Sequence, residues 1–436
     1  MRSRKKALSP SNIPVLSLKN CQGSLPPASC SQRLHRLSTA LAAPIVDIGK
    51  STSPLAHRLA AALVKQILWL GVPEDAPLTH RADAWRLVLG YLPVVTASRE
   101  QQLERKRRHY QDMYKQHCDA DVMCESDQKT LKQIRVDLPR TNQSIRLFKD
   151  KRVQKLMERV LYIWSVRNPA SGYVQGINDL LVLFVAALSR PYMGCFSLDT
   201  EAVDRLTERD LEEIEADSFY CLSRILSHMQ DNYTENQPGV YKSLNRLKDL
   251  MKRIDVKLCD HLEALGIDFM QFPFRWMNCM MIRELPLDCA IRLWDTYIAE
   301  INEGIVAFHE YVSAVFLSVW SDELLHMDYQ QCLLFLQRLP TLDWGIEEVD
   351  AVISKADALR KLPQTGICLC VILLYMLLLL CAAWCWVRPR FMPFPFVEAD
   401  LPHYRLVKRA DVGVHQPSTL RLIVWALQVP PYWWQR

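Results

Sequence analysis

Apolar residues recur at helical spacing through most of the chain, and the clearest case begins at Val153. Counted from Val153, apolar residues occupy offsets of 3, 4, 7, 8 and 11, ending at Trp164. These offsets line one face of a helix with 3.6 residues per turn, and charged residues such as Glu158 take the other face. The same period predicts further helices at 59–70, 82–89, 180–188, 219–229, 241–265, 309–319, 329–336 and 349–362. No stretch has a convincing strand pattern, so an all-α fold is predicted.

The first part of the chain departs from this pattern. Residues 1–55 carry Ser, Pro, Arg and Lys without a helical period, and Asp47 is their only acidic residue. No apolar segment of the kind found in secretory signals follows the basic start. We therefore expect residues 1–55 to be a disordered basic arm.

The last part of the chain also departs from this pattern, because it contains a long apolar stretch. Residues 366–387 form a stretch of 22 residues without a charge, with Trp384 and Trp386 at one end and basic residues on both flanks. A bilayer core requires about 20 apolar residues, so this stretch predicts one transmembrane helix. The alternative is that it and the tail 388–436 are not native coding sequence, and hydropathy leaves both open.

Charge and cysteine content exclude several classes of protein. A net charge of +5 over 436 residues lacks the strong basic balance of a nucleic-acid-binding protein. The 14 cysteines include no Cys-x-x-Cys pair, which favours buried free thiols in a reducing compartment over a disulfide framework or metal site. We expect a solvated helix face at 99–114 and an exposed helix start in the acidic run 208–215.

Two polar motifs flank the amphipathic helix. The first, Ile134-x-x-Asp137-x-x-Arg140, places Arg140 directly after a proline, which disfavours helix at Leu138. We therefore expect Arg140 in a loop or at a helix start. The second is Gly172-Tyr-Val-Gln175-Gly, in which the glycines permit a tight turn. An arginine that stabilises phosphoryl charge and a glutamine that orients water are what phosphoryl transfer to water requires.

These motifs resemble the paired finger motifs of the TBC domain family, which activates Rab GTPases. Other motifs in the same order strengthen the resemblance, because several weak motifs at consistent spacing are more specific than one. They are Arg81-x-x-x-Trp85, Arg283-Glu-Leu-Pro286 and Arg292-Leu-Trp294-Asp295. The resemblance covers about residues 60–362, and the expected domain is 56–362. It implies a two-lobed, multi-helix, all-α fold in which Arg81, Trp85, Trp294 and Asp295 are structural.

The resemblance also implies roles for the two motifs. Arg140 corresponds to an arginine finger, and Gln175 to a residue that positions water in place of the GTPase's own glutamine. Asp137 is expected to hold Arg140 or its loop by hydrogen bonds. Orienting or supporting roles fall to Tyr173, Gly176 and Asn178. The chain would thus be a GTPase activator that supplies catalytic residues in trans, rather than an enzyme by itself.

The resemblance also leads to expectations about cofactors, partners and place of action. The chain has no glycine-rich phosphate loop, so we do not expect it to bind nucleotide by itself. The resemblance implies no cofactor of its own and action on GTP and Mg²⁺ bound to a partner Rab, and we expect no metal site. The stretches 168–179 and 230–234 look closest to the member 22 subgroup, which includes the yeast activator of the early-Golgi Rab. This implies a role in vesicle trafficking, with the protein in the cytoplasm at Golgi or other endomembranes. Two alternatives are a non-catalytic scaffold that binds a Rab or adaptor at a membrane, and a membrane tether.

Overall fold

The computed structural model describes residues 30–42, 54–117 and 124–362, and within these ranges every regular element is a helix. The first helices are α1 (Cys30–Ala42), α2 (Pro54–Trp69), α3 (Leu78–Val88), α4 (Arg99–His117), α5 (Glu125–Asp137), α6 (Arg146–Lys149), α7 (Lys151–Arg167), α8 (Ile177–Met193) and α9 (Glu208–Leu226). The others are α10 (Pro238–Ile254), α11 (Val256–Ala264), α12 (Phe274–Cys279), α13 (Leu287–Ala299), α14 (Ile305–Ser318), α15 (Ser321–Leu324), α16 (Tyr329–Gln337) and α17 (Ile346–Lys361). Short 3₁₀ helices are η2 (Thr96–Ser98), η3 (Leu138–Arg140), η4 (Glu201–Arg205) and η5 (Gln230–Asn232). The predicted all-α class is confirmed.

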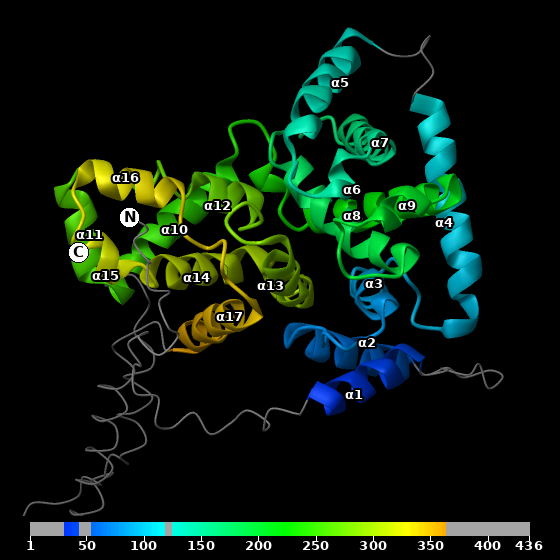
Figure 1. The fold of residues 1–436 in the computed structure, drawn as a ribbon, viewed down its shortest axis with the longest axis horizontal. Coiled ribbons are helices and arrows are strands. Elements are labelled where there is room, and N and C mark those ends of the chain that lie inside the picture. Colours follow the sequence, from blue (N-terminus) through cyan, green and yellow to red (C-terminus); the bar gives the residue numbers. More distant parts are fainter. Residues whose placement is uncertain (1–29, 43–53, 118–123, 363–436) are drawn as a thin grey trace, which may run out of the picture. The chain divides into compact units, whose positions relative to one another are not determined.

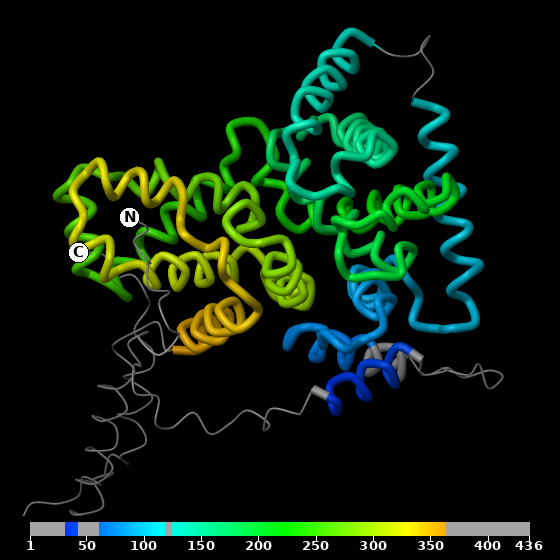
Figure 2. Tube along the Cα trace, viewed as in Figure 1, coloured from blue at the N-terminus to red at the C-terminus, as the bar shows by residue number. Residues whose placement is uncertain are grey.

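The helices up to residue 362 form two groups, which Figures 1 and 2 show side by side. In the first group, α9 packs against α8, α7 and α4, and α5 packs on α7. In the second, α14 packs against α17 and α10. Helix α13 contacts α2, α3 and α8 as well as α17, and therefore joins the two groups. The expected two-lobed arrangement is present.

The predicted amphipathic helix is α7, and Asp150 caps its start. The Asp150 carboxylate accepts a hydrogen bond from the Arg152 amide at 2.8 Å, and this satisfies one of the free N–H groups of the first turn. All the predicted apolar residues, Val153 through Trp164, are buried. Helix α8 follows and is buried almost throughout, and its apolar central stretch, residues 180–188, lies in the core of the first group behind the second motif.

The prediction of a disordered arm over residues 1–55 is wrong for residues 30–42, which form α1. Its Leu37, Ala40 and Leu41 are buried, and the helix packs against α2 and α3. The Arg99 guanidinium donates to the Leu41 carbonyl at 2.8 Å and caps the helix end. The apolar stripe of α1 is short, and basic residues surround it. Their composition therefore favoured a disordered segment over a helix.

The expectation of a solvated face at 99–114 is also wrong in part. Arg107 donates two hydrogen bonds to the buried Asp217 carboxylate, at 2.8 and 2.9 Å. Burial by itself would raise the pKa of Asp217, but Arg86 and Arg107 outweigh it and lower that pKa. The acidic run also departs from its prediction, because its last residue, Glu215, is buried. Its carboxylate accepts a hydrogen bond from the Tyr110 hydroxyl at 2.7 Å. Contacts between α4 and α9, far apart in sequence, decide these positions.

The residues expected to be structural meet at the fully buried carboxylate of Asp295. The Trp85 indole donates to it at 2.7 Å, the Val72 amide at 3.0 Å, and Arg81 Nε at 3.2 Å. Trp294 is buried beside it and donates to the Met280 carbonyl at 3.3 Å. Asp295 therefore ties the start of α3 and the α2–α3 connection to α13.

Replacing Asp295 with asparagine is expected to lower the free energy of unfolding by about 3–5 kcal/mol. The new amide group would point an N–H at donors that need an acceptor, and would leave Arg81 without its partner charge. Urea unfolding followed by circular dichroism measures the change. Glu125→Gln is the control, since its pair with Lys129 is exposed on both sides and should contribute less than about 1 kcal/mol. An equal effect of the two substitutions would contradict this role for Asp295.

In the three described ranges, no helix is both long and apolar enough to cross a bilayer. The predicted span 366–387 and the tail 388–436 lie outside the described residues, as do residues 1–29.

Candidate functional site

Arg140 lies at the end of the 3₁₀ turn that follows α5. Pro139 was expected to disfavour helix at Leu138, and this is wrong, because Leu138 keeps helical backbone angles of φ −58° and ψ −46°. The α-helix ends here, and its last carbonyls lack N–H donors from a following turn, so side chains satisfy two of them instead. Arg140 Nε donates to the Val136 carbonyl at 3.1 Å, and the Thr141 hydroxyl donates to the Asp137 carbonyl at 2.9 Å.

Asp137 holds the Arg140 guanidinium, as predicted. Arg140 Nη2 donates to Asp137 Oδ1 at 2.9 Å, and the Asp137 side chain is 8% exposed while that of Arg140 is 64% exposed. The buried carboxylate thus fixes one edge of an otherwise exposed planar fork. The outer part of the fork faces solvent, where it can bind a ligand brought from outside.

Gln175 is exposed at the turn between α7 and α8. Gly176, next to it, has φ +114° and caps α8, a conformation that strongly favours glycine. The Gly176 amide donates to Asn178 Oδ1 at 2.9 Å. The predicted tight turn is present, and it presents the Gln175 side chain at the surface.

Buried hydrogen bonds join the Arg140 turn to the Gln175 turn. The Tyr173 hydroxyl donates to Asp137 Oδ2 at 3.0 Å, and Asn178 Nδ2 donates to Thr141 Oγ1 at 2.9 Å. Burial, followed by the charge of Asp137, raises the pKa of Tyr173, so its hydroxyl stays protonated and serves as a donor. The structure thus brings five of the predicted residues, Asp137, Arg140, Tyr173, Gly176 and Asn178, into one connected cluster with Gln175.

Sequence reasoning missed two members of this cluster. Thr141 bridges Asp137 and Asn178, and Asn278 of α12 donates from Nδ2 to the Gln175 carbonyl at 2.8 Å. A weak signal for Asn278 was present, because it is the one amide side chain in the apolar run 276–282. The remaining predicted residues, Arg81, Trp85, Trp294 and Asp295, belong to the structural cluster described above.

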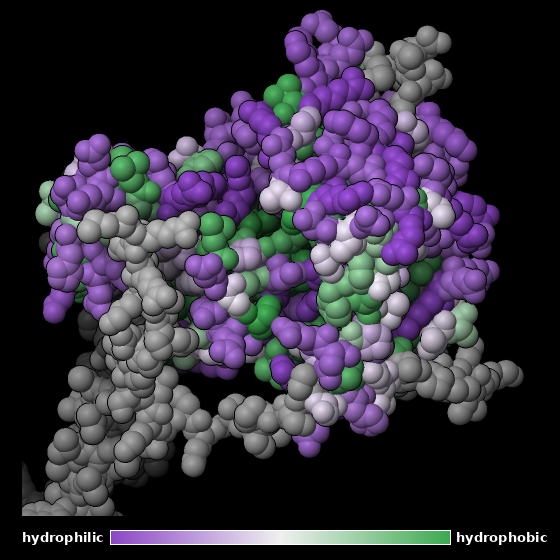
Figure 3. Space-filling model, in the orientation of Figure 1, coloured by the Kyte–Doolittle hydropathy of each residue, from purple (hydrophilic) through white to green (hydrophobic). Residues whose placement is uncertain are grey.

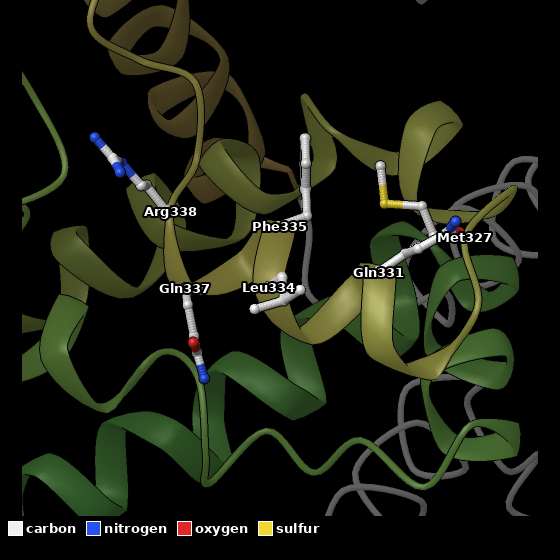
Figure 4. Close-up of a pocket in the computed structure, with 6 residues that line it drawn as sticks. All are labelled: Met327, Gln331, Leu334, Phe335, Gln337 and Arg338. Carbon is white, nitrogen blue, oxygen red and sulfur yellow. The ribbon is translucent and has the colours of Figure 1, made fainter.

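Other surface features of the described residues can be compared with this cluster. In the described part of the chain, no group of three or more His, Cys, Asp or Glu side chains is arranged to hold a metal ion. Figure 3 shows a largely hydrophilic face with hydrophobic residues gathered in its hollowed centre. A shallow hollow of about 820 Å³ on α16 is lined by Met327, Gln331, Leu334, Phe335, Gln337 and Arg338 (Figure 4). It lies in the group of helices that does not carry Arg140 (Figure 1).

The geometry of the cluster limits what it can do. Two exposed polar side chains project from turns that a buried network holds in place, and such a network restricts the turns before a ligand arrives. Arg140 and Gln175 can donate hydrogen bonds to an anionic group and to a water molecule. The arrangement therefore suits a surface that completes a site on another molecule.

Comparison with known proteins gives matches over most of the described residues. Residues 78–325 match the profile of the Rab-GTPase-TBC domain. The GTPase-activating protein gyp1 of Schizosaccharomyces pombe is 41% identical over 327 residues, covering 74% of this chain and 60% of that protein. Human TBC1 domain family member 22B is 44% identical over 298 residues, covering 68% of this chain and 58% of that protein. The chain thus spans about three fifths of the length of these relatives.

A solved structure also matches. The crystal structure of the Ypt/Rab-GAP domain of Gyp1p superposes with a TM-score of 0.67 and 36% sequence identity. The match covers 76% of this chain and 98% of that domain. It therefore takes in nearly the whole of a solved domain of the same all-helical kind.

Proposed function

The chain belongs to the Rab-GTPase-TBC domain family, and from this membership we propose that it is a GTPase-activating protein for a Rab-family small GTPase. The printed names of its relatives support the activity, since gyp1 is a GTPase-activating protein and the matching solved structure is a Ypt/Rab-GAP domain. The partner supplies GTP and Mg²⁺, and this chain supplies side chains in trans.

The observation that carries the proposal is the hydrogen-bonded cluster joining the Arg140 and Gln175 turns. Arg140 donates to the oxygens of the transferring phosphoryl group and stabilises the charge that spreads over them. Gln175 orients the attacking water through its side-chain amide. Asp137 keeps the Arg140 fork oriented, and Tyr173 and Asn178 keep the two turns in register.

The setting of this activity follows from the same proposal. Stimulated hydrolysis switches a Rab to its GDP-bound form, so the protein would regulate vesicle trafficking at Golgi or other endomembranes. The scaffold alternative keeps the Rab contact and removes the acceleration. Arg140 and Gln175 are exposed, and buried hydrogen bonds hold the turns that carry them. This arrangement favours the activator, because a scaffold has no need to fix an exposed guanidinium.

A hydrolysis screen tests the proposal. The full chain is added in catalytic amounts to a panel of GTP-loaded Rab proteins, and phosphate release is followed over time. We expect a rate increase of at least about 10³-fold over intrinsic hydrolysis for one Rab or a small subset. Stable binding to a Rab without any acceleration would support the scaffold and contradict the proposal.

A further inference from the structure

One peptide group, that between Gln175 and Gly176, is held at both of its polar atoms by asparagine side chains. The Gln175 carbonyl accepts from Asn278 Nδ2 at 2.8 Å, and the Gly176 N–H donates to Asn178 Oδ1 at 2.9 Å. The C=O and N–H of a trans peptide point in opposite directions, so these two bonds fix the plane of the peptide. That plane sets the direction in which the Gln175 side chain leaves the backbone.

The two asparagines come from different groups of helices. Asn178 lies in the first turn of α8, whereas Asn278 lies on α12, 103 residues beyond Gln175. Helix α12, which packs against α10 and α14 of the second group, therefore supplies the bond to the Gln175 carbonyl. Asn278 is 8% exposed, so water does not readily replace its amide at this carbonyl.

Asn278 is itself held in a fixed orientation. Its Oδ1 accepts from Gln237 Nε2 at 2.9 Å, and its backbone carbonyl accepts from the buried Tyr233 hydroxyl at 2.7 Å. Gln237 Nε2 also donates to the Asn232 carbonyl, and Gln237 adopts the left-handed region with φ +46°. A residue other than glycine adopts this left-handed conformation at a cost in free energy. In Gln237 the conformation places the side-chain amide against Asn278.

Gly176 allows Asn278 to come this close. A Cβ on residue 176 would lie 2.5 Å from Asn278 Nδ2, well inside van der Waals contact. Positive φ and close approach therefore require glycine at the same position. The turn therefore needs glycine at residue 176 both for its backbone conformation and for its contact with Asn278.

From this geometry we propose that Asn278, supported by Gln237, is a positioning residue for Gln175. The inference rests on the proposed function and deepens it, because it assigns the orientation of the glutamine finger to the second group of helices. Asn278 does not contact the reacting atoms. It fixes the peptide from which Gln175 projects, and misplacement of a catalytic group by about 1 Å can cost about 100-fold in rate.

The test compares Asn278→Ala with wild type in steady-state activation of the Rab identified by the screen. The expected result is a fall in kcat of about 10-fold to 100-fold with KM changed by less than about threefold, because ground-state binding comes from the wider surface. Hydrogen exchange over residues 173–177 should become faster in the variant. Ser243→Ala is the matched control: it removes another buried hydrogen bond of the second group, to Glu310 at 2.9 Å, and should change neither quantity.

Gln237→Asn provides a second variant should Asn278→Ala fail to fold. Asparagine tolerates the left-handed conformation but is too short to reach Asn278, and Gln237 is only half-buried. It should lower kcat in the same direction by about 3-fold to 10-fold. Unchanged kcat in both variants beside an active wild type would overturn the positioning role alone. An inactive wild type across the whole panel would overturn the proposed function instead.

Discussion

Arg140→Ala and Arg140→Lys are each expected to reduce stimulated GTP hydrolysis by about 10³-fold or more while leaving the fold intact. The magnitude is that of arginine fingers in GTPases. In this protein the guanidinium divides its donors between the protein and the solvent side. Nε and Nη2 bind the Val136 carbonyl and Asp137, and the rest of the fork is directed outward. A lysine ammonium cannot hold Asp137 and span several phosphate oxygens at once, so its positive charge does not rescue the rate.

Stability should change little in either variant, because the Arg140 side chain is 64% exposed and the buried Asp137 carboxylate keeps its hydrogen bond from the Tyr173 hydroxyl. Single-turnover hydrolysis with saturating activator gives the rate, and thermal unfolding checks the fold. Arg209→Lys is the control, since Arg209 is 86% exposed on α9 and pairs only with Glu213 of its own helix. A lysine variant that stimulates hydrolysis like wild type would show the finger assignment to be wrong.

Local pattern was sufficient to predict most of the helices, because their apolar stripes are long. The Val153–Trp164 stripe became α7, and the motifs at its two ends lie in one hydrogen-bonded cluster. The bond from Arg140 to Asp137 agrees with the role that the family resemblance implied for Asp137.

The prediction failed where contacts distant in sequence decide the outcome. Arg107 seemed to belong to a solvated face, but it pairs with the buried Asp217 of α9. Residues 30–42 seemed to lack order, but α2 and α3 provide an apolar surface for α1. Asn278 could not be assigned to the Gln175 turn, because no local rule relates residues 103 positions apart. These are tertiary effects that override local propensity.

A mimic of the transferring phosphoryl group is expected to lock the correct Rab onto this protein. Affinity for the Rab bound to GDP and aluminium fluoride should exceed affinity for the Rab bound to a GTP analogue by about 10²-fold or more. Arg140 and Gln175 gain their contacts chiefly as charge and geometry shift during hydrolysis, so the ground-state complex lacks part of this energy. Isothermal titration with the Rab carrying GDP alone, the analogue, or GDP with aluminium fluoride measures the difference.

The variants decide whether the two fingers act on one transition state. Arg140→Ala and Gln175→Ala should each lose most of the extra affinity for the fluoride complex and keep most of the affinity for the analogue. The double variant should lose less than the sum of the single losses, because both side chains contact one small group and their turns share the hydrogen bonds through Asp137 and Asn178. Additive losses would mean that the two residues act on separate groups. Equal affinity of the wild type for the analogue and the fluoride complex would contradict the catalytic role, and the scaffold would then account for the binding. A surface that binds the ground state and the transition-state mimic equally well cannot lower the barrier to GTP hydrolysis.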